Sequence, residues 1–264
     1  MNKLLRVLIL ALGAGAAAPA AALAMAYEPS GLDWSAGEVE AASQATMQGL
    51  LDRAAKAGRI GCERHCERIE AIYQRLLHEA RQQSPHAAAL PWSLTVVRLQ
   101  QVEAMALPGG QVVVSEAFID ERQLSDQALA FVLAHEMAHS ILEHERQALT
   151  FARMLLPQVV SRSVQDMYVE LDLSLSLLIA MEPVLQQGEF EADELGLLLA
   201  SAAGYAPERQ LDFIDDECAA QDASVKLVAT HPPACTRQQQ LQARLPLALR
   251  IWQLTLPSPR PATD

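Results

Sequence analysis

The most constraining feature of this sequence is an apolar segment that carries two histidines and a glutamate. Residues 128–142 are apolar on nearly every side of a helix, which predicts a helix buried in the core. Within it lies His135-Glu136-Met137-Ala138-His139. Histidines four residues apart share one helix face, about 6 Å from each other, and can bind one metal ion. Burying these polar groups without a partner would be costly, so the segment predicts a metal-binding helix.

Two histidines do not complete a metal site, and the next well-marked helix offers a third ligand. Glu189 and Asp193 are four residues apart and share one face of that helix, while Glu191 points elsewhere. We expect Glu189 to bind the metal and Asp193 to accept the free N–H of a ligand histidine. A Glu-x-x-x-Asp pattern is common on exposed helices, so its weight comes from following the histidine pair. Two imidazoles and one carboxylate with an open position for water suit zinc.

The first 26 residues have the three-part layout of a secretory signal peptide. Lys3 and Arg6 give a positive start, residues 7–18 form an uncharged and largely apolar run, and cleavage is expected after Ala24 or Ala26. The alternative is an uncleaved membrane anchor, for which the apolar run is short. We therefore expect a periplasmic or otherwise exported protein after signal-peptide cleavage.

Composition and cysteine count narrow the class further. The chain has 264 residues, 51% of them hydrophobic, and a net charge of −12, which argues against a nucleic-acid-binding protein. Four cysteines in an exported protein are more typical of disulfide bonds than of a metal site. The simplest pairing joins Cys62 to Cys66 and Cys218 to Cys235, although four cysteines allow three connectivities.

The order of patterns predicts an α+β fold that is mostly helical, in a single domain over residues 27–256. A helical lead over 38–82 precedes three short strands within 93–115, and the active-site helix is expected over about 126–147. The remainder is helical, with Pro183 ending an apolar helix, and residues 257–264 form a proline-rich tail. The three strands are expected at Ser93–Leu99, Val102–Leu107 and Gln111–Ser115.

Four motifs in this order resemble peptidase family M48, the gluzincin zinc metalloproteases. The motifs are the segment 104–110, His135-Glu136-x-x-His139 with His144, Glu189-x-x-x-Asp193, and His231-Pro232 with Arg237, and the resemblance spans about residues 64–245. It implies a gluzincin fold and a zinc endopeptidase with one zinc per chain, ligands His135, His139 and Glu189, and Glu136 as the catalytic carboxylate. It also implies that the strands over 104–114 border the cleft. The substrate edge is then formed by Ala104, Met105, Ala106, Gly109 and Gly110.

The resemblance gives roles to the residues around this centre. His144 is expected as a supporting residue behind a ligand, and His231 and Arg237 as groups that stabilise the oxyanion. His231 is alternatively a fourth zinc ligand that displaces the water and keeps the enzyme latent. Glu136 takes the proton of the attacking water. An extended peptide is expected to pair with the strand 111–115.

The sequence therefore predicts an exported zinc endopeptidase that hydrolyses unfolded or misassembled envelope proteins. Its partners are polypeptide substrates, with envelope assembly machinery or the membrane periphery as further candidates. One alternative is a zinc-binding chaperone or scaffold without turnover, against which the intact Glu136 argues. Another is a zinc hydrolase acting on a non-protein envelope amide.

Overall fold

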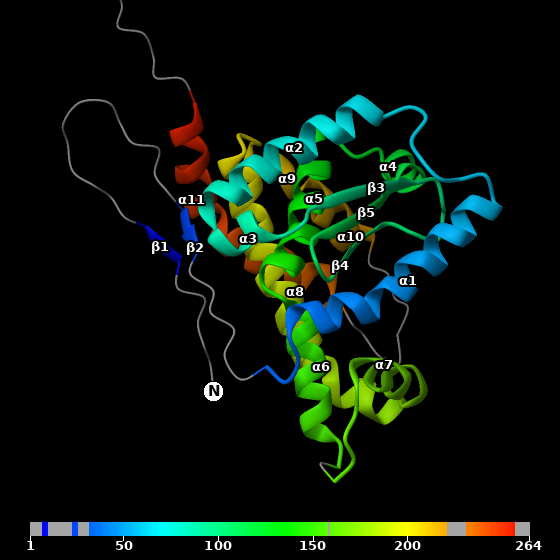
Figure 1. The fold of residues 1–264 in the computed structure, drawn as a ribbon. Coiled ribbons are helices and arrows are strands. Elements are labelled where there is room, and N and C mark those ends of the chain that lie inside the picture. The colour runs from blue at the N-terminus through cyan, green and yellow to red at the C-terminus, as the bar shows by residue number, and fades with distance from the viewer. Residues whose placement is uncertain (1–6, 10–22, 26–31, 158, 221–230, 257–264) are drawn as a thin grey trace, which may run out of the picture.

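The computed structural model describes residues 7–9, 23–25, 32–157, 159–220 and 231–256 (Figure 1). The body is mostly helical with a small three-stranded sheet, as the sequence predicts. Near the N-terminus, β1 (Val7–Ile9) and β2 (Leu23–Met25) pair as a separate antiparallel ribbon. The rest of the expected signal peptide and the tail 257–264 lie outside the described residues. The signal peptide therefore stays a prediction.

Eleven helices are present in the described part of the chain, and the expected helical lead consists of the first two of them. They are α1 (Ala36–Lys56), α2 (Cys66–Gln83), α3 (Pro85–Ala89), α4 (Glu116–Glu121), α5 (Asp126–Ile141), α6 (His144–Leu155), α7 (Val164–Leu173), α8 (Leu175–Ala202), α9 (Pro207–Gln210), α10 (Asp212–Ala220) and α11 (Ala234–Thr255).

The three strands lie where the sequence predicts them, with the first two shorter than expected. They are β3 (Ser93–Val97), β4 (Ala104–Leu107) and β5 (Gln111–Ser115), in the spatial order β3-β5-β4. The central strand β5 pairs in parallel with β3 and antiparallel with β4. Gly109 and Gly110 connect β4 to β5 with φ of +87° and +79°, a backbone region that favours glycine.

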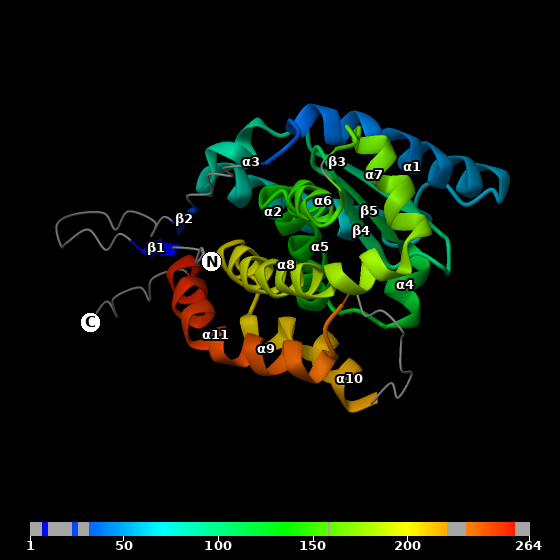
Figure 2. The same cartoon turned by 90° about the horizontal axis from the view of Figure 1, so that it is seen from below.

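The alternation of side chains along β5 explains how the sheet is covered. Val112 and Val114 belong to the main core with α2 and α5, whereas Val113 packs on the other face with Leu50 of α1. Helix α5 contacts the sheet, α2 and α8, which makes it the centre of the molecule (Figures 1 and 2). Its apolar circumference is explained by burial on every side.

Helix α8 packs against α5, and α11 packs on α8 from the other side (Figure 2). Ser174 begins α8, because its hydroxyl accepts a hydrogen bond from the N–H of Leu177. The expectation that Pro183 ends a helix was wrong, since α8 continues through it to Ala202. Proline cannot donate a backbone hydrogen bond, and α8 is packed along its length against α5, α6 and α11. None of the described helices combines the length and hydropathy that a membrane span requires.

Helices α6 and α7 and the first turns of α8 form a lobe that extends below the body in Figure 1. A separate apolar cluster holds this lobe together, with Leu149 from α6, Met167 from α7 and Met181 from α8 at its centre. Trp34, just before α1, packs into the same cluster. The lobe is therefore built around its own small core.

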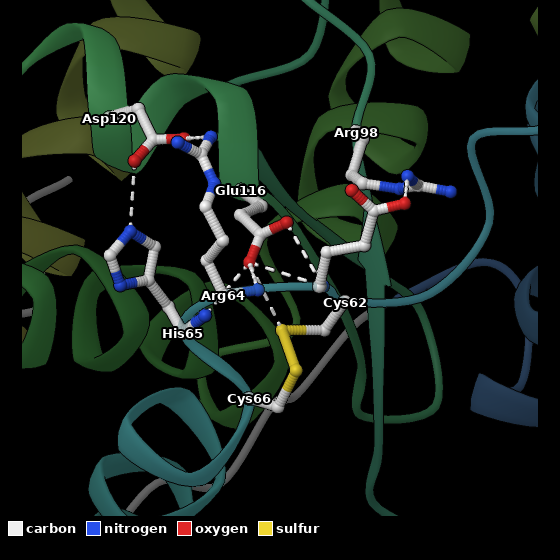
Figure 3. The surroundings of a disulfide bond; sticks show 8 residues. Cys62, Arg64, His65, Cys66, Arg98, Glu116 and Asp120 are labelled. Carbon is white, nitrogen blue, oxygen red and sulfur yellow. Dashed lines mark hydrogen bonds and ion pairs between the residues drawn. A yellow bond between two sulfur atoms is a disulfide. The ribbon is translucent and has the colours of Figure 1, made fainter.

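Both disulfides follow the simplest of the three connectivities. Cys62 bonds to Cys66, the first residue of α2, and Cys218 of α10 bonds to Cys235 of α11. Figure 3 shows that the buried carboxylate of Glu116 faces the first disulfide. Glu116 accepts hydrogen bonds from the backbone N–H groups of Arg64 and His65, at 2.6 and 2.8 Å. This carboxylate therefore ties the start of α4 to the loop that leads into α2.

Candidate active site

The two motif histidines face each other from successive turns of α5. The Nε2 atoms of His135 and His139 lie 3.1 Å apart, and His135 is only 6% exposed. Burial and the neighbouring His135 together lower the pKa of His139 well below its ordinary value. The two Nε2 atoms of the α5 pair therefore face one point.

Glu189 of α8 completes a set of three donors, as the sequence predicts. Its Oε1 lies 3.5 Å from Nε2 of His139, and its Oε2 lies 3.5 Å from Nε2 of His135. Burial alone would raise the pKa of Glu189, but the neighbouring His135 lowers it to about 2. Oε2 is buried and has no hydrogen-bond partner among the described residues. A carboxylate oxygen left in this state beside two imidazoles fits a zinc ion.

The close approach of α8 to α5 depends on Gly196, two turns beyond Glu189. A Cβ at this buried position would lie 2.9 Å from the backbone N of His135 and 3.0 Å from its Cα. These distances are shorter than real Cβ contacts, so only glycine allows this helix spacing. Gly196 therefore sets the distance between the two helices that supply the metal ligands.

Asp193 holds the first ligand histidine from behind. Its Oδ1 lies 3.0 Å from Nδ1 of His135, which directs Nε2 towards Glu189. Arg237 of α11 donates from Nε and Nη2 to Asp193, at 2.8 and 2.6 Å. Burial would raise the pKa of Asp193, and the hydrogen bond from Arg237 lowers it instead. Arg237 is buried, contacts this carboxylate and is not among the residues that line the cleft, so its expected role at the oxyanion stays a prediction.

His144 holds the second ligand histidine in a similar way. Its Nδ1 lies 3.0 Å from Nδ1 of His139, and its Nε2 lies 3.4 Å from Glu191. The helix expected over 126–147 is in fact two helices, because α5 ends at Ile141 and His144 begins α6. Glu143 between them has φ +53°, a left-handed conformation that turns the chain. This turn places His144 beside His139.

Glu191 is the site residue that sequence reasoning missed. It was expected to point elsewhere, yet it contacts His144 and lines the cleft. The helical period does place it away from Glu189, and only the turn at Glu143 brings a partner to its side. Sequence spacing carries no signal for that turn, because glutamate is unusual in the left-handed region.

Glu136 lies beside the metal ligands and lines the same cleft. Burial raises its pKa from the ordinary value, and the charge of His135 opposes that shift. A carboxyl group beside a metal site, with its pKa raised by burial, is suited to accept and release a proton. Its position agrees with the role of general base.

The cleft has a volume of about 1000 Å³ and one wall formed by the sheet edge. Ala104, Met105 and Ala106 of β4 line it, and so does Gly109, whereas Gly110 packs on Trp92 instead. The expectation that a peptide pairs with 111–115 was wrong, because β5 is paired on both sides. In the described sheet, the edge strand that lines the cleft is β4.

His231 lies at the mouth of the site. Its Nε2 is 3.5 Å from Oε2 of Glu189, and 61% of its side chain is exposed. It lines the cleft together with the ligands. A third imidazole is thus within reach of the three-donor set, on the solvent side.

A second group of ligand-type atoms is used for other purposes. Cys62, Cys66 and Glu116 lie close together, but the two sulfurs form a disulfide and the carboxylate accepts backbone hydrogen bonds (Figure 3). Among the described residues, His135, His139 and Glu189 are therefore the set available for a metal ion.

A histidine pair and a glutamate from a second helix, with a carboxylate beside them, define a zinc metallopeptidase site of the gluzincin type. The model of peptidase family M48 matches residues 63–245 of the sequence. Because this match covers more than half of the chain, the protein belongs to peptidase family M48, whose members depend on zinc.

Relatives in the same family agree with this assignment. The chain is 31% identical over 166 residues to mitochondrial metalloendopeptidase OMA1 of Schizosaccharomyces pombe, covering 60% of this chain and 48% of that protein. It is 27% identical over 206 residues to mitochondrial metalloendopeptidase OMA1 of Homo sapiens, covering 71% of this chain and 39% of that protein. The chain thus spans about half, or less, of the length of these curated relatives.

Proposed function

We propose that this protein is an exported zinc-dependent endopeptidase that cleaves unfolded or misassembled polypeptides of the cell envelope. The observation that carries the reaction type is the carboxylate of Glu189, whose two oxygens each lie 3.5 Å from the Nε2 atom of one motif histidine. Its buried Oε2 has no hydrogen-bond partner among the described residues. His135, His139 and Glu189 would hold the zinc ion, and Glu136 lies beside them in an open cleft.

The cleft supports a polypeptide as the substrate. β4 is an edge strand of the described sheet, and three of its residues line the cleft. An extended chain that adds to such an edge is bound through main-chain hydrogen bonds, which every sequence offers. Recognition of this kind selects segments that are free to extend, as in unfolded proteins.

Different residues of the chain have different roles in hydrolysis. When bound, zinc polarises the scissile carbonyl and makes the attacking water more acidic. Glu136 accepts the proton of that water and delivers it to the leaving amine nitrogen. Asp193 and His144 keep the ligand imidazoles in place, and β4 orients the peptide backbone. His231 faces the same centre from the solvent side.

Replacing Glu136 with glutamine tests the reaction type. Glu136→Gln keeps the shape of the side chain and removes the proton acceptor, so we expect turnover of unfolded casein to fall by about 10²–10⁴-fold or more. Zinc content and the thermal melting temperature should stay at the wild-type level. A chelator should abolish wild-type cleavage, and added zinc should restore it.

Three results would contradict the proposal. Unchanged casein cleavage by Glu136→Gln would refute the role of Glu136 as general base. A zinc-loaded wild type that binds unfolded casein without cleaving it would favour a zinc-binding chaperone. Hydrolysis of non-protein envelope amides without any cleavage of unfolded polypeptides would favour the alternative hydrolase. Short peptides in the same assay separate these outcomes.

Export is supported by the N-terminal sequence pattern and by two disulfides, which persist in oxidising compartments. Mass spectrometry of the protein from the extracytoplasmic fraction should show a chain that begins at Met25 or Tyr27. A full-length chain found only in the cytoplasm would contradict this part of the proposal.

A further inference from the structure

Exposed apolar side chains are concentrated on the lobe formed by residues 144–182. Eight of the eleven exposed large hydrophobic residues in the described part of the chain lie there. They include Leu173 at 81% exposure, Leu175 at 49% and Ile179 at 47%. The full set on the lobe is Met154, Leu155, Val159, Val160, Val169, Leu173, Leu175 and Ile179. Such a concentration marks an interaction surface.

This apolar surface continues into the cleft along two helices. On α8, Leu175, Ile179 and Pro183 are spaced four residues apart and share one helix face, and Pro183 lines the cleft. On α6, Met154 is 69% exposed and also lines the cleft, one turn from Phe151, which lines it too. Helix α6 leaves the active site and α8 returns to it (Figure 1). The two apolar stripes therefore both lead from the lobe to the metal ligands.

We propose that the lobe is a docking surface for apolar segments of the same polypeptide that the cleft cleaves. This inference rests on the proposed endopeptidase function. A segment held on the lobe keeps the adjoining stretch of chain near β4, so the surface selects unfolded proteins by the apolar side chains they expose. Native proteins bury those side chains and lack the contact.

Charge favours a polypeptide over a lipid surface. The lobe carries five acidic residues and three arginines. Each arginine forms an ion pair, Arg146 with Glu143, Arg153 with Asp33 and Arg162 with Glu170. Surfaces that bind membranes combine apolar side chains with basic residues that meet the headgroups. The acidic excess here repels anionic lipids, whereas a polypeptide segment is free to be neutral or basic.

The helix geometry sets the length of the probe. Glu189 and Leu175 are separated by fourteen residues of α8, about 21 Å at 1.5 Å per residue. An extended peptide covers that distance with about six or seven residues. A substrate must therefore place its apolar block at least this far from the bond that is cleaved.

The test uses two quenched peptides with the same cleavable centre. In one, both flanks carry Leu and Val beyond the seventh residue from the centre; in the other, serine replaces each Leu and Val. We expect wild-type KM to be about ten-fold lower for the apolar peptide, with similar kcat, because docking adds binding that does not change during reaction. In the triple variant Leu173→Ser, Leu175→Ser, Ile179→Ser, the ratio of the two KM values should fall to about one.

A matched variant controls for the loss of exposed apolar surface in general. Ile60→Ser, Leu254→Ser, Leu256→Ser removes side chains of 46%, 63% and 46% exposure outside the lobe, and should keep the ten-fold ratio. Circular dichroism and melting temperature show whether both variants fold. Anisotropy of a labelled apolar flank, without the cleavable centre, measures docking even if neither peptide is hydrolysed. It therefore distinguishes failure of this inference from failure of the proposed function.

Four outcomes would overturn the inference. The first is an equal KM of the wild type for both peptides. The second is a control variant whose ratio of KM values falls as far as that of the lobe variant. The third is a lobe variant that keeps the wild-type ratio of KM values but no longer co-sediments with vesicles of zwitterionic and anionic phospholipid, which would assign the surface to a membrane. The fourth is a lobe variant that keeps the wild-type ratio of KM values but differs from the wild type in molar mass by light scattering, which would assign the surface to a second copy of the chain.

Discussion

Adding one methyl group at Gly196 should weaken the metal centre without touching a ligand. The Cβ of Gly196→Ala would lie 2.9 Å from the backbone N of His135, whereas ordinary contacts begin near 3.4 Å. Backbone atoms inside the core cannot rotate away as a side-chain end can, so α8 and α5 must separate by about 0.5 Å at this turn. Glu189 and Asp193 lie on the same helix and move with it.

Two effects of opposite sign determine the stability of this variant. Overpacking a core typically costs about 1–3 kcal/mol. Alanine is favoured over glycine inside a helix by about 1 kcal/mol, which offsets part of that cost. We expect a net loss of about 1 kcal/mol in the free energy of unfolding. The metal centre is more sensitive, because ligand distances tolerate only about 0.2 Å, so zinc affinity should fall by about 10-fold or more.

Zinc affinity is measured by competition with a chromophoric chelator, and stability by thermal unfolding of the zinc-free and zinc-loaded protein. Gly49→Ala in α1 is the matched control, because its nearest neighbour is a flexible arginine end at 3.6 Å. That variant should be more stable than wild type by up to about 1 kcal/mol and bind zinc equally well. Wild-type zinc affinity in Gly196→Ala would refute the idea that this contact sets the spacing of the ligands.

Three further predictions concern the residues around the zinc ion. Elemental analysis should find one zinc per chain, and His139→Ala should lower zinc content and melting temperature together, because metal binding is coupled to folding; full metal content in that variant would contradict the ligand set. Asp193→Asn should lower zinc affinity by about 10–100-fold in a chelator titration, since it weakens the anchor of His135, and an unchanged affinity would contradict that role. His231→Ala should raise basal peptide cleavage, because it removes an imidazole that would occupy the open zinc position, whereas a fall of about 10²-fold or more would assign His231 to oxyanion stabilisation.

The metal ligands could be predicted from the sequence because their geometry is local. His135 and His139 share a helix face through the period of the α-helix alone, and a buried helix makes their polarity informative. Glu189 required a second helix to pack on the first, which the order of motifs indicates but the period does not. The three short strands were also predictable, since their boundaries are marked by a change of hydrophobic period and by the turn before Gln111.

The features that the sequence did not reveal all depend on tertiary contacts. Pro183 would end an isolated helix, whereas α8 continues through it and contacts α5, α6 and α11 along its length. The position of β5 in the middle of the sheet depends on a parallel pairing with β3, and no turn residues in the sequence predict that pairing. Arg237 was expected at the substrate, yet its guanidinium lies on Asp193, because α11 packs against the far side of α8.

The supporting groups behind the two ligand histidines show why the site needs most of the fold. Asp193 reaches His135 from α8 and is itself held by Arg237 from α11, while His144 reaches His139 only because the chain turns at Glu143. Each imidazole is thus fixed by a residue whose position depends on a different part of the molecule. A change in α11 or in the turn after α5 is therefore transmitted to zinc geometry through hydrogen bonds of 2.6–3.0 Å. Helix α5 supplies the ligands, and the elements around it determine how well those ligands are held.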